Sequence, residues 1–177
     1  LIKQGFITKS ESGYTLSHMG LAYVDRISTK NFTVRTQPKI ITMTFIEDDD
    51  GRVLLQQRDK QPYINAWTLP YGKIHDDDES IVDAASREIC EKAGLMVKSP
   101  RHVGDCYIRV RLEDDLVLTT LAHIFHARVS SGDAIGKWCK VSDISNSKLA
   151  PAVMEIVRTV TKSESYFFAE FSLDWYN

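Results

Sequence analysis

The sequence predicts an α/β domain preceded by a small appendage made of a β-hairpin and a helix. Its 177 residues suffice for one full α/β domain with chain to spare, and 43% of them are apolar, as in an ordinary globular protein. Apolar, β-branched runs lie on both sides of a helix whose two ends are clearly signalled. We place the boundary in a polar connector, which gives an appendage of 1–35 and a main domain of 36–177.

The appendage is expected to form a hairpin from the segments 5–8 and 14–16, followed by a helix. Ser17 is expected to cap this helix, because a serine side chain accepts a hydrogen bond from a free backbone N–H of the first turn. The order of the segments resembles the wing and last helix of a winged-helix domain, without the recognition helix that precedes a wing. The alternative is a hairpin and helix that pack on the main domain, and DNA is a partner only if a winged helix exists upstream.

The main domain is expected to be rich in β-strands. The strands 40–46 and 53–57 flank an acidic run that ends in Asp50-Gly51, which suits a hairpin and which we interpret as a solvated turn. An aromatic tail is expected to pack against the body or against a second subunit, so a homodimer is one of two arrangements left open. The other expected elements are strands at 106–112, at 116–129 (broken or curved) and at 138–141, a last amphipathic helix at 148–161, and the tail at 166–176.

The composition excludes several classes of protein. A net charge of −2 gives no overall basic field of the kind that a dedicated nucleic-acid binder carries. Cys90, Cys106 and Cys139 are too few and too scattered for a disulfide framework, which favours a reducing, cytoplasmic setting. The sequence shows neither a signal peptide nor an apolar run long enough to span a bilayer, so no membrane partner is expected.

The helix predicted over 80–93 carries the candidate chemistry. Ser80 can cap its start and Gly94 can end it. Glu88 and Glu91 stand three residues apart and therefore share one face. Two carboxylates held close together repel each other unless a cation lies between them, and oxygen ligands favour a hard ion such as Mg²⁺ or Mn²⁺. An isolated Glu-x-x-Glu is more often a solvated helix face, so its surroundings decide.

These surroundings resemble the Nudix hydrolase family, whose signature is Gly-x5-Glu-x7-Arg-Glu-U-x-Glu-Glu-x-Gly-U, with U an aliphatic residue. The flanking segments 53–58 and 67–70, and a late strand that opens with Trp138, also resemble the family. The resemblance covers 38–162 and implies an α/β/α sandwich with a mixed sheet. The signature is matched in order and spacing by Glu79, Arg87, Glu88, Ile89, Glu91, Gly94 and Leu95.

The resemblance also implies roles for individual residues. Glu88 and Glu91 would bind Mg²⁺ or Mn²⁺, and Gly72 would open the loop and offer a backbone carbonyl near the ion. Glu79 and Arg87 would form an ion pair that braces the loop and the helix. For substrate binding we name Arg58, in the strand that resembles the family, and Tyr71, a candidate for stacking on a base.

The sequence departs from the family pattern at four places. Lys92 stands where the family has its last box glutamate, and an ammonium group cannot coordinate Mg²⁺. Tyr71 replaces a glycine, the loop from Gly72 to Glu79 is one residue longer, and His75 replaces an acidic residue. A surviving site would recruit acids from 76–78 or 113–115, which otherwise are turn residues. We interpret His75 as an ordinary polar or packing residue. The same interpretation applies to His102, His123 and His126.

Two functions from different classes follow. The first is a Mg²⁺-dependent hydrolase of a nucleoside diphosphate linked to another moiety. The second is a catalytically weakened domain that binds a nucleotide-type ligand and acts as a sensor or transcriptional regulator. Lys92 and the altered loop favour the second, whereas the implied family membership favours the first. The sequence leaves the identity of the substrate open.

Overall fold

The computed structural model describes residues 2–24, 26–28, 33–34, 36–130, 133–144 and 148–175. The chain divides into two compact units, Leu1–Gln37 and Pro38–Asn177. The boundary between the units falls in the polar connector, next to Pro38. No helix of the described residues is both long enough and apolar enough to cross a membrane.

The first unit is a hairpin followed by a helix, in the order that the sequence predicts. Strands β1 (Ile7–Ser10) and β2 (Gly13–Leu16) pair antiparallel, and helix α1 spans His18–Val24. The side chain of Ser17 accepts a hydrogen bond of 3.0 Å from the backbone N–H of Gly20, so Ser17 is the N-cap.

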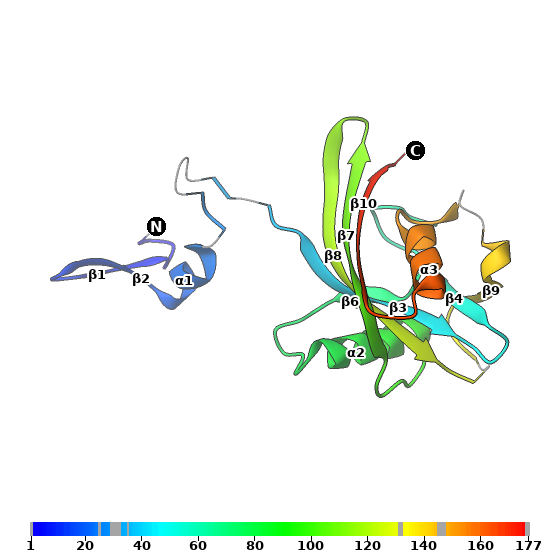
Figure 1. Ribbon diagram of the computed structural model, residues 1–177. Helices are drawn as coiled ribbons and strands as arrows, with labels where there is room; N and C mark the ends of the chain where they lie inside the picture. Colours follow the sequence, from blue (N-terminus) through cyan, green and yellow to red (C-terminus); the bar gives the residue numbers. More distant parts are fainter. Residues whose placement is uncertain are drawn as a thin grey trace. The chain divides into compact units, whose positions relative to one another are not determined.

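The second unit is built on a mixed eight-stranded sheet (Figure 1). Its main path follows the order β10-β7-β8-β3-β4-β5, with β6 paired to β3 and β9 paired to β4. Two of these pairings, β3 with β8 and β10 with β7, are parallel, and the others are antiparallel. The strands are β3 (Lys39–Glu47), β4 (Arg52–Gln57), β5 (Trp67–Thr68), β6 (Tyr71–Lys73), β7 (Arg101–Leu112), β8 (Asp115–Arg128), β9 (Lys137–Lys140) and β10 (Phe167–Asp174).

Helices α2 (Ile81–Ala93) and α3 (Val153–Lys162) belong to two separate apolar cores. Successive side chains of strand β3 point to opposite faces of the sheet, so this strand contributes to both cores. Met43 lies in the larger core with Ile156 of α3, whereas Ile46 lies in the smaller core with Ile89 of α2. The two helices therefore cover opposite faces, which confirms the predicted α/β/α sandwich.

The structure decides between alternatives left open in the C-terminal half and moves the start of its helix. Strand β8 is continuous from Asp115 to Arg128, because β7 and β3 pair with it on both sides. Helix α3 begins at Val153, later than predicted, since Pro151 and the left-handed Ala152 (φ 68°) interrupt a helix that would start near 148. The aromatic tail packs against the body of its own chain as β10, parallel to β7.

The acidic turn between β3 and β4 is not simply solvated, as the sequence had suggested. The side chain of Asp48 is fully buried and forms a 2.7 Å ion pair with Arg52. Its carboxylate also accepts hydrogen bonds from the backbone N–H groups of Asp50 (3.1 Å) and Arg52 (2.8 Å). Asp48 thus shapes the turn by satisfying backbone donors.

Candidate active site

Helix α2 is fixed at both ends. The N–H of Asp83 donates to the hydroxyl of Ser80 (3.1 Å), and that hydroxyl donates to the Asp83 carboxylate (2.6 Å). Ser80 thus caps the helix as predicted, and Asp83 binds its side chain in a variant of the capping box. Gly94 ends the helix in the left-handed conformation (φ 67°), and its N–H donates to the Cys90 carbonyl (3.0 Å). The side chains of the last turns therefore project from a well-defined helix.

Glu88 is the buried carboxylate of this helix. Its residue is 5% exposed, and its Oε1 accepts a hydrogen bond of 2.7 Å from Nη1 of Arg87. Its Oε2 is buried and has no hydrogen-bond partner among the described residues. A buried carboxylate oxygen without a donor is costly, and a bound cation would remove that cost. Glu88 is thus the strongest candidate for a metal ligand.

The backbone of Gly72 lies directly against this carboxylate. Gly72 is in β6 and pairs with Thr42 of β3. A Cβ atom added at position 72 would lie 1.8 to 2.1 Å from the carboxylate atoms of Glu88, closer than any real contact. A glycine is required here by close approach, and the structure brings together two of the three residues that the family resemblance assigns to the metal.

Arg87 braces the loop, but its partner is Asp78 and not the predicted Glu79. Its Nε and Nη2 each donate to one Asp78 carboxylate oxygen at 2.8 Å, and Nη2 also donates to the carbonyl of Lys73 (3.0 Å). Glu79 is exposed. The longer loop explains the change, because Asp78 keeps the five-residue spacing from Gly72 that the signature requires of its acid.

Hydrogen bonding keeps the Asp78 carboxylate ionised. The guanidinium of Arg87, together with the backbone N–H of His75, holds the pKa of Asp78 well below its usual range. In turn, Asp78 raises the pKa of Arg87. The brace is therefore an ion pair over the whole neutral pH range.

Glu91 lies about one helical turn after Glu88 and is more exposed to solvent. Its side chain is 55% exposed, and its Oε1 lies 3.7 Å from Nη1 of Arg87, the nitrogen that also contacts Glu88. The two carboxylates therefore share one guanidinium, which reduces their mutual repulsion. Both remain on the same side of α2, as the spacing predicts.

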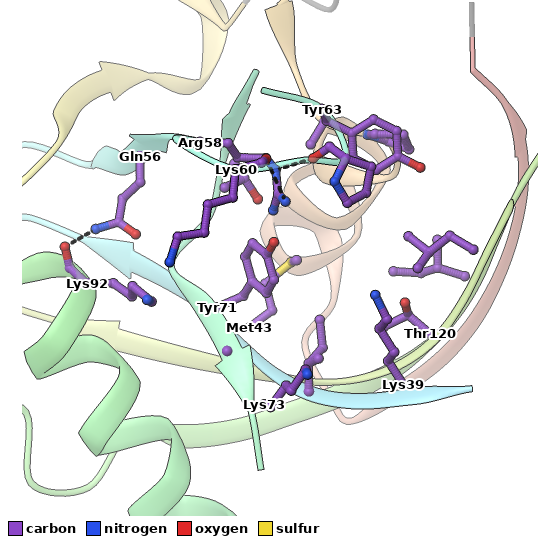
Figure 2. A pocket seen from close by; sticks show the side chains of 18 of the residues that line it. Lys39, Met43, Gln56, Arg58, Lys60, Tyr63, Tyr71, Lys73, Lys92 and Thr120 are labelled. Atoms are coloured by element: carbon purple, nitrogen blue, oxygen red, sulfur yellow. Dashed lines mark hydrogen bonds between the residues drawn. The ribbon is translucent and has the colours of Figure 1, made fainter. Parts of the chain in front are cut away.

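A cavity of about 590 Å³ opens beside Glu88. Its wall is formed by β3, β4 and the loop that follows β4, by β6 and α2, and by one face of β7 and β8. Five cationic side chains line it, against two acidic ones, Asp59 and Glu88. The labelled lysines come from separate elements and surround Tyr71 in Figure 2. The cavity therefore favours an anionic ligand, and its cations are Lys39, Arg58, Lys60, Lys73 and Lys92.

Arg58 and Tyr71, the predicted substrate-binding residues, meet in this cavity. The guanidinium of Arg58 stands over the ring of Tyr71 at 5.3 Å, and its Nε donates to the carbonyl of Pro62 (2.8 Å). Burial lowers the pKa of Arg58. A second tyrosine, Tyr63, lines the same wall and packs edge-on against Trp175 (4.6 Å between centroids). Arg58 thus holds its own loop in place and keeps an aromatic face beside the cavity.

Sequence reasoning missed the ring of lysines that lines the cavity. Among the described residues that line the cavity there is no member of 76–78 or 113–115, although His75 is included. The lysines gave no sequence signal, because each is isolated in the chain and a lone lysine is usually a surface residue. Lys92, noted only as a defect in the metal site, is part of this basic wall.

The sandwich, the capped helix and the buried glutamate beside a glycine define a Nudix-type domain. The comparison with known families agrees, because residues 37–160 match the NUDIX domain. The chain therefore belongs to the Nudix family.

Individual relatives are distant but match three quarters or more of this chain. The uncharacterized Nudix hydrolase YvcI of Bacillus subtilis is 25% identical over 139 residues, which is 75% of this chain and 85% of that protein. The MutT protein of Bacillus halodurans superposes with a TM-score of 0.60 at 25% identity, over 76% of this chain and 89% of that one. The NUDIX domain of Shewanella oneidensis NrtR, solved with ADP ribose, superposes with a TM-score of 0.61 at 19% identity, over 80% and 96%.

The Asp78–Arg87 pair predicts an acid-sensitive contribution to stability. The pKa of Asp78 in the folded protein lies below the ordinary 3.8. The ion pair therefore contributes fully to the free energy of unfolding above about pH 4, and this contribution is lost as the pH falls towards the folded-state pKa. Urea unfolding should show wild type as more stable than Asp78→Asn at neutral pH, with the gap closing below about pH 4. The exposed neighbour offers a control, Asp77→Asn, which should match wild type throughout. A gap that stays constant with pH would contradict this assignment.

The contact between Gly72 and Glu88 predicts a coupled pair of mutations. Gly72→Ala should lower the free energy of unfolding by about 1–3 kcal/mol, because the added methyl group forces the carboxylate to move. In a Glu88→Ala background the same change should cost much less, since the carboxylate that it meets is gone. Chemical unfolding of the four proteins measures this coupling. Equal costs in both backgrounds would show that the two residues are not in contact.

Proposed function

We propose that the second unit is a Mg²⁺- or Mn²⁺-dependent hydrolase of a nucleoside diphosphate linked to another moiety. One observation carries the proposal: Glu88, which has a buried carboxylate oxygen without a hydrogen-bond donor, lines a cavity whose charged side chains are mostly cationic. A divalent cation would satisfy the oxygen, and a phosphate chain would satisfy the cations. An unpaired carboxylate oxygen together with several cationic side chains is expected where a metal ion and a diphosphate bind together.

The residues present fit such an ion, despite Lys92. Mg²⁺ retains several waters and commonly takes only one or two carboxylates from the protein. Glu88 and Glu91 on α2, with the backbone of Gly72 beside Glu88, would hold it. When bound, the ion would polarise a phosphate and activate a water for attack on phosphorus.

The other residues of the cavity would bind and orient the substrate. Lys39, Lys60 and Lys73 approach from different strands and loops, so they can neutralise several oxygens of a phosphate chain. Tyr71 and Tyr63 offer aromatic faces to a base. Arg87 would keep the Glu88 carboxylate in position through its 2.7 Å hydrogen bond. The NUDIX domain of NrtR, solved with ADP ribose, supports a ligand of this class.

A second candidate function is ligand binding without turnover, as a sensor or transcriptional regulator. Lys92 favours it, because a lysine in the cavity wall can hold a phosphate directly as a point charge while weakening a nearby metal site. In that case the hairpin and helix of the first unit would belong to the part that transmits the signal. The same purified protein can distinguish the two functions.

A turnover assay tests the hydrolase. Nucleoside diphosphate derivatives, including ADP-ribose-like and oxidised nucleotides, are incubated with the protein with and without Mg²⁺ or Mn²⁺, and released products are measured. We expect metal-dependent hydrolysis that falls by about 10²-fold or more in Glu88→Gln. The exposed acid of the loop gives the matched control, Glu79→Gln, which should stay near wild type. Absence of turnover, combined with thermal stabilisation by one of the same compounds, would establish the binding module instead.

A substitution at position 92 should raise hydrolysis, whereas Glu88→Gln should lower it. Lys92→Glu restores the acid that the family signature has there, so Mg²⁺ should bind more tightly and hydrolysis should rise. Isothermal titration with Mg²⁺ and the turnover assay measure the two effects. Lys60→Glu, which places the same charge change elsewhere on the cavity wall, should weaken substrate binding without strengthening Mg²⁺ binding. If neither quantity changes in Lys92→Glu, the charge at position 92 does not limit the site.

A further inference from the structure

A second cluster of ligating side chains lies outside the cavity. Nε2 of His102 and Nδ1 of His123 approach the same oxygen of Asp105, Oδ1, at 2.9 and 2.7 Å. These three ligand atoms lie within 4.8 Å of one another, and among the described residues no other such group of three was found. The histidines, which the sequence suggested were ordinary polar residues, therefore have defined partners.

The cluster is on the opposite face of the sheet from the wall of the cavity. Ile108 of β7 lines the cavity, and Asp105 lies three residues earlier in the same strand, so it points the other way. Asp105 pairs directly with His123 of β8, whose neighbours Ala122 and Ile124 belong to the main core. None of the three residues lines the cavity, so the cluster shares no residue with it. His123 points to the same face of β8 as Ala127, which lies in the smaller core with Ile89, so the cluster is on the face that α2 covers.

A β-bulge brings the third residue to the same face. In a regular strand His102 and Asp105, three positions apart, would point to opposite sides. The pairing of β7 with β8 shifts its register between His102 and Gly104, and this irregularity places both side chains together. Bulges of this kind commonly re-aim a side chain at a functional site.

Gly104, at the bulge, also makes room for β10, which brings Tyr166 to the cluster. A Cβ atom added there would lie 2.6 Å from the carbonyl oxygen of Phe167, so only glycine allows β10 to approach so closely. The residue before Phe167 is Tyr166, and its hydroxyl donates to Oδ2 of Asp105. Tyr166 thereby orients the carboxylate so that its other oxygen faces the two imidazoles, as outer hydrogen bonds do in metal sites.

From this geometry we propose that His102, His123 and Asp105 bind a Zn²⁺ ion that ties β7 to β8 and, through Tyr166, to the start of β10. In a tetrahedral zinc site, ligand atoms at about 2.0–2.1 Å from the metal lie about 3.3 Å apart. The present separations from Asp105 Oδ1, 2.7 and 2.9 Å, are about 0.5 Å shorter than this, and all three ligand atoms lie within 4.8 Å of one another. Three protein ligands leave the fourth position to water.

The chemistry of the donors selects the ion. Two imidazoles and one carboxylate suit Zn²⁺, whereas Mg²⁺ prefers oxygen ligands only. The neighbouring Cys106 is not a ligand, because it is fully buried in the main core and, as the next residue of the strand, points to the other face of the sheet. The exposed fractions of the three ligating side chains, 19% to 26%, leave a route for the ion from solvent.

Packing holds the rings in place before any ion binds. The ring of His102 stacks on Phe125 with centroids 5.0 Å apart, and it makes edge contacts with His123 and Tyr166, each at 5.5 Å. Phe125 is fully buried, so this platform is rigid. The arrangement stands independently of the proposed hydrolase reaction, because it shares no residue with that site.

Titration calorimetry with Zn²⁺ tests the proposal, in a Cys90→Ser background that removes an exposed thiol. We expect one Zn²⁺ per chain, unchanged by Glu88→Gln and not displaced by excess Mg²⁺. His123→Gln should weaken binding by at least about 10-fold. The matched control is His126→Gln, because His126 is on the same strand but bonds Glu47, and it should bind as the background protein does. Equal binding by His123→Gln and the background, or equal losses in both variants, would overturn the proposal.

A second measurement needs no substitution in the cluster and so does not depend on the folding of a variant. Zn²⁺ is added to the Cys90→Ser protein, and the imidazole signals are followed by NMR. The signals of His102 and His123 should shift in proportion to the metal added, while those of His18 and His75 stay unchanged. No binding, or shifts confined to other histidines, would show that the cluster is only a hydrogen-bonded network.

Discussion

The guanidinium of Arg87 is the interaction on which the candidate active site depends. It joins three parts of the chain that the sequence separates: the loop through Asp78, strand β6 through the carbonyl of Lys73, and helix α2 through Glu88. A planar group with several donors in fixed directions can make these contacts at once, which a lysine cannot. Because the loop and the helix are locked together, Glu88 is held against Gly72 with one oxygen left free.

The second constraint is the shape of β6 and its neighbours. Gly72 must lack a side chain for the carboxylate to fit, while Tyr71, at a position where the family keeps a glycine, turns its ring to the cavity under Arg58. The change from glycine to tyrosine therefore does not obstruct the site. It supplies an aromatic wall, and the surrounding lysines make the same space attractive to phosphate groups.

The wall of the cavity and the proposed zinc cluster lie on opposite faces of the sheet, whereas Glu88 is on α2, which covers the face of the cluster. The cavity lies on the face that carries Ile108 and Val110, and the His102–Asp105–His123 cluster lies on the other. Strands β7, β8 and β10 run side by side in Figure 1, so both sites depend on the same pairing. An ion bound to the cluster would cross-link β7 and β8 near the start of β10, which pairs parallel to β7.

The sequence by itself determined the elements whose signals are local. Ser80 and Gly94 delimit α2, and the spacing of Glu88 and Glu91 puts both on one face, because capping and helical periodicity depend only on nearby residues. The family signature added the sandwich fold and the importance of Gly72. Local signals also gave the hairpin and helix of the first unit in the right order.

Tertiary structure alone decided which partners meet. Asp78 and Glu79 are adjacent acids, and only the path of the longer loop delivers the first of them to Arg87. Isolated lysines become a basic wall when the strands that carry them assemble. His102 and Asp105 reach the same face only because of a bulge set by the pairing with β8. The basic wall and the bulge depend on pairings between strands that are distant in the chain, and spacing along the sequence carries no information about such pairings.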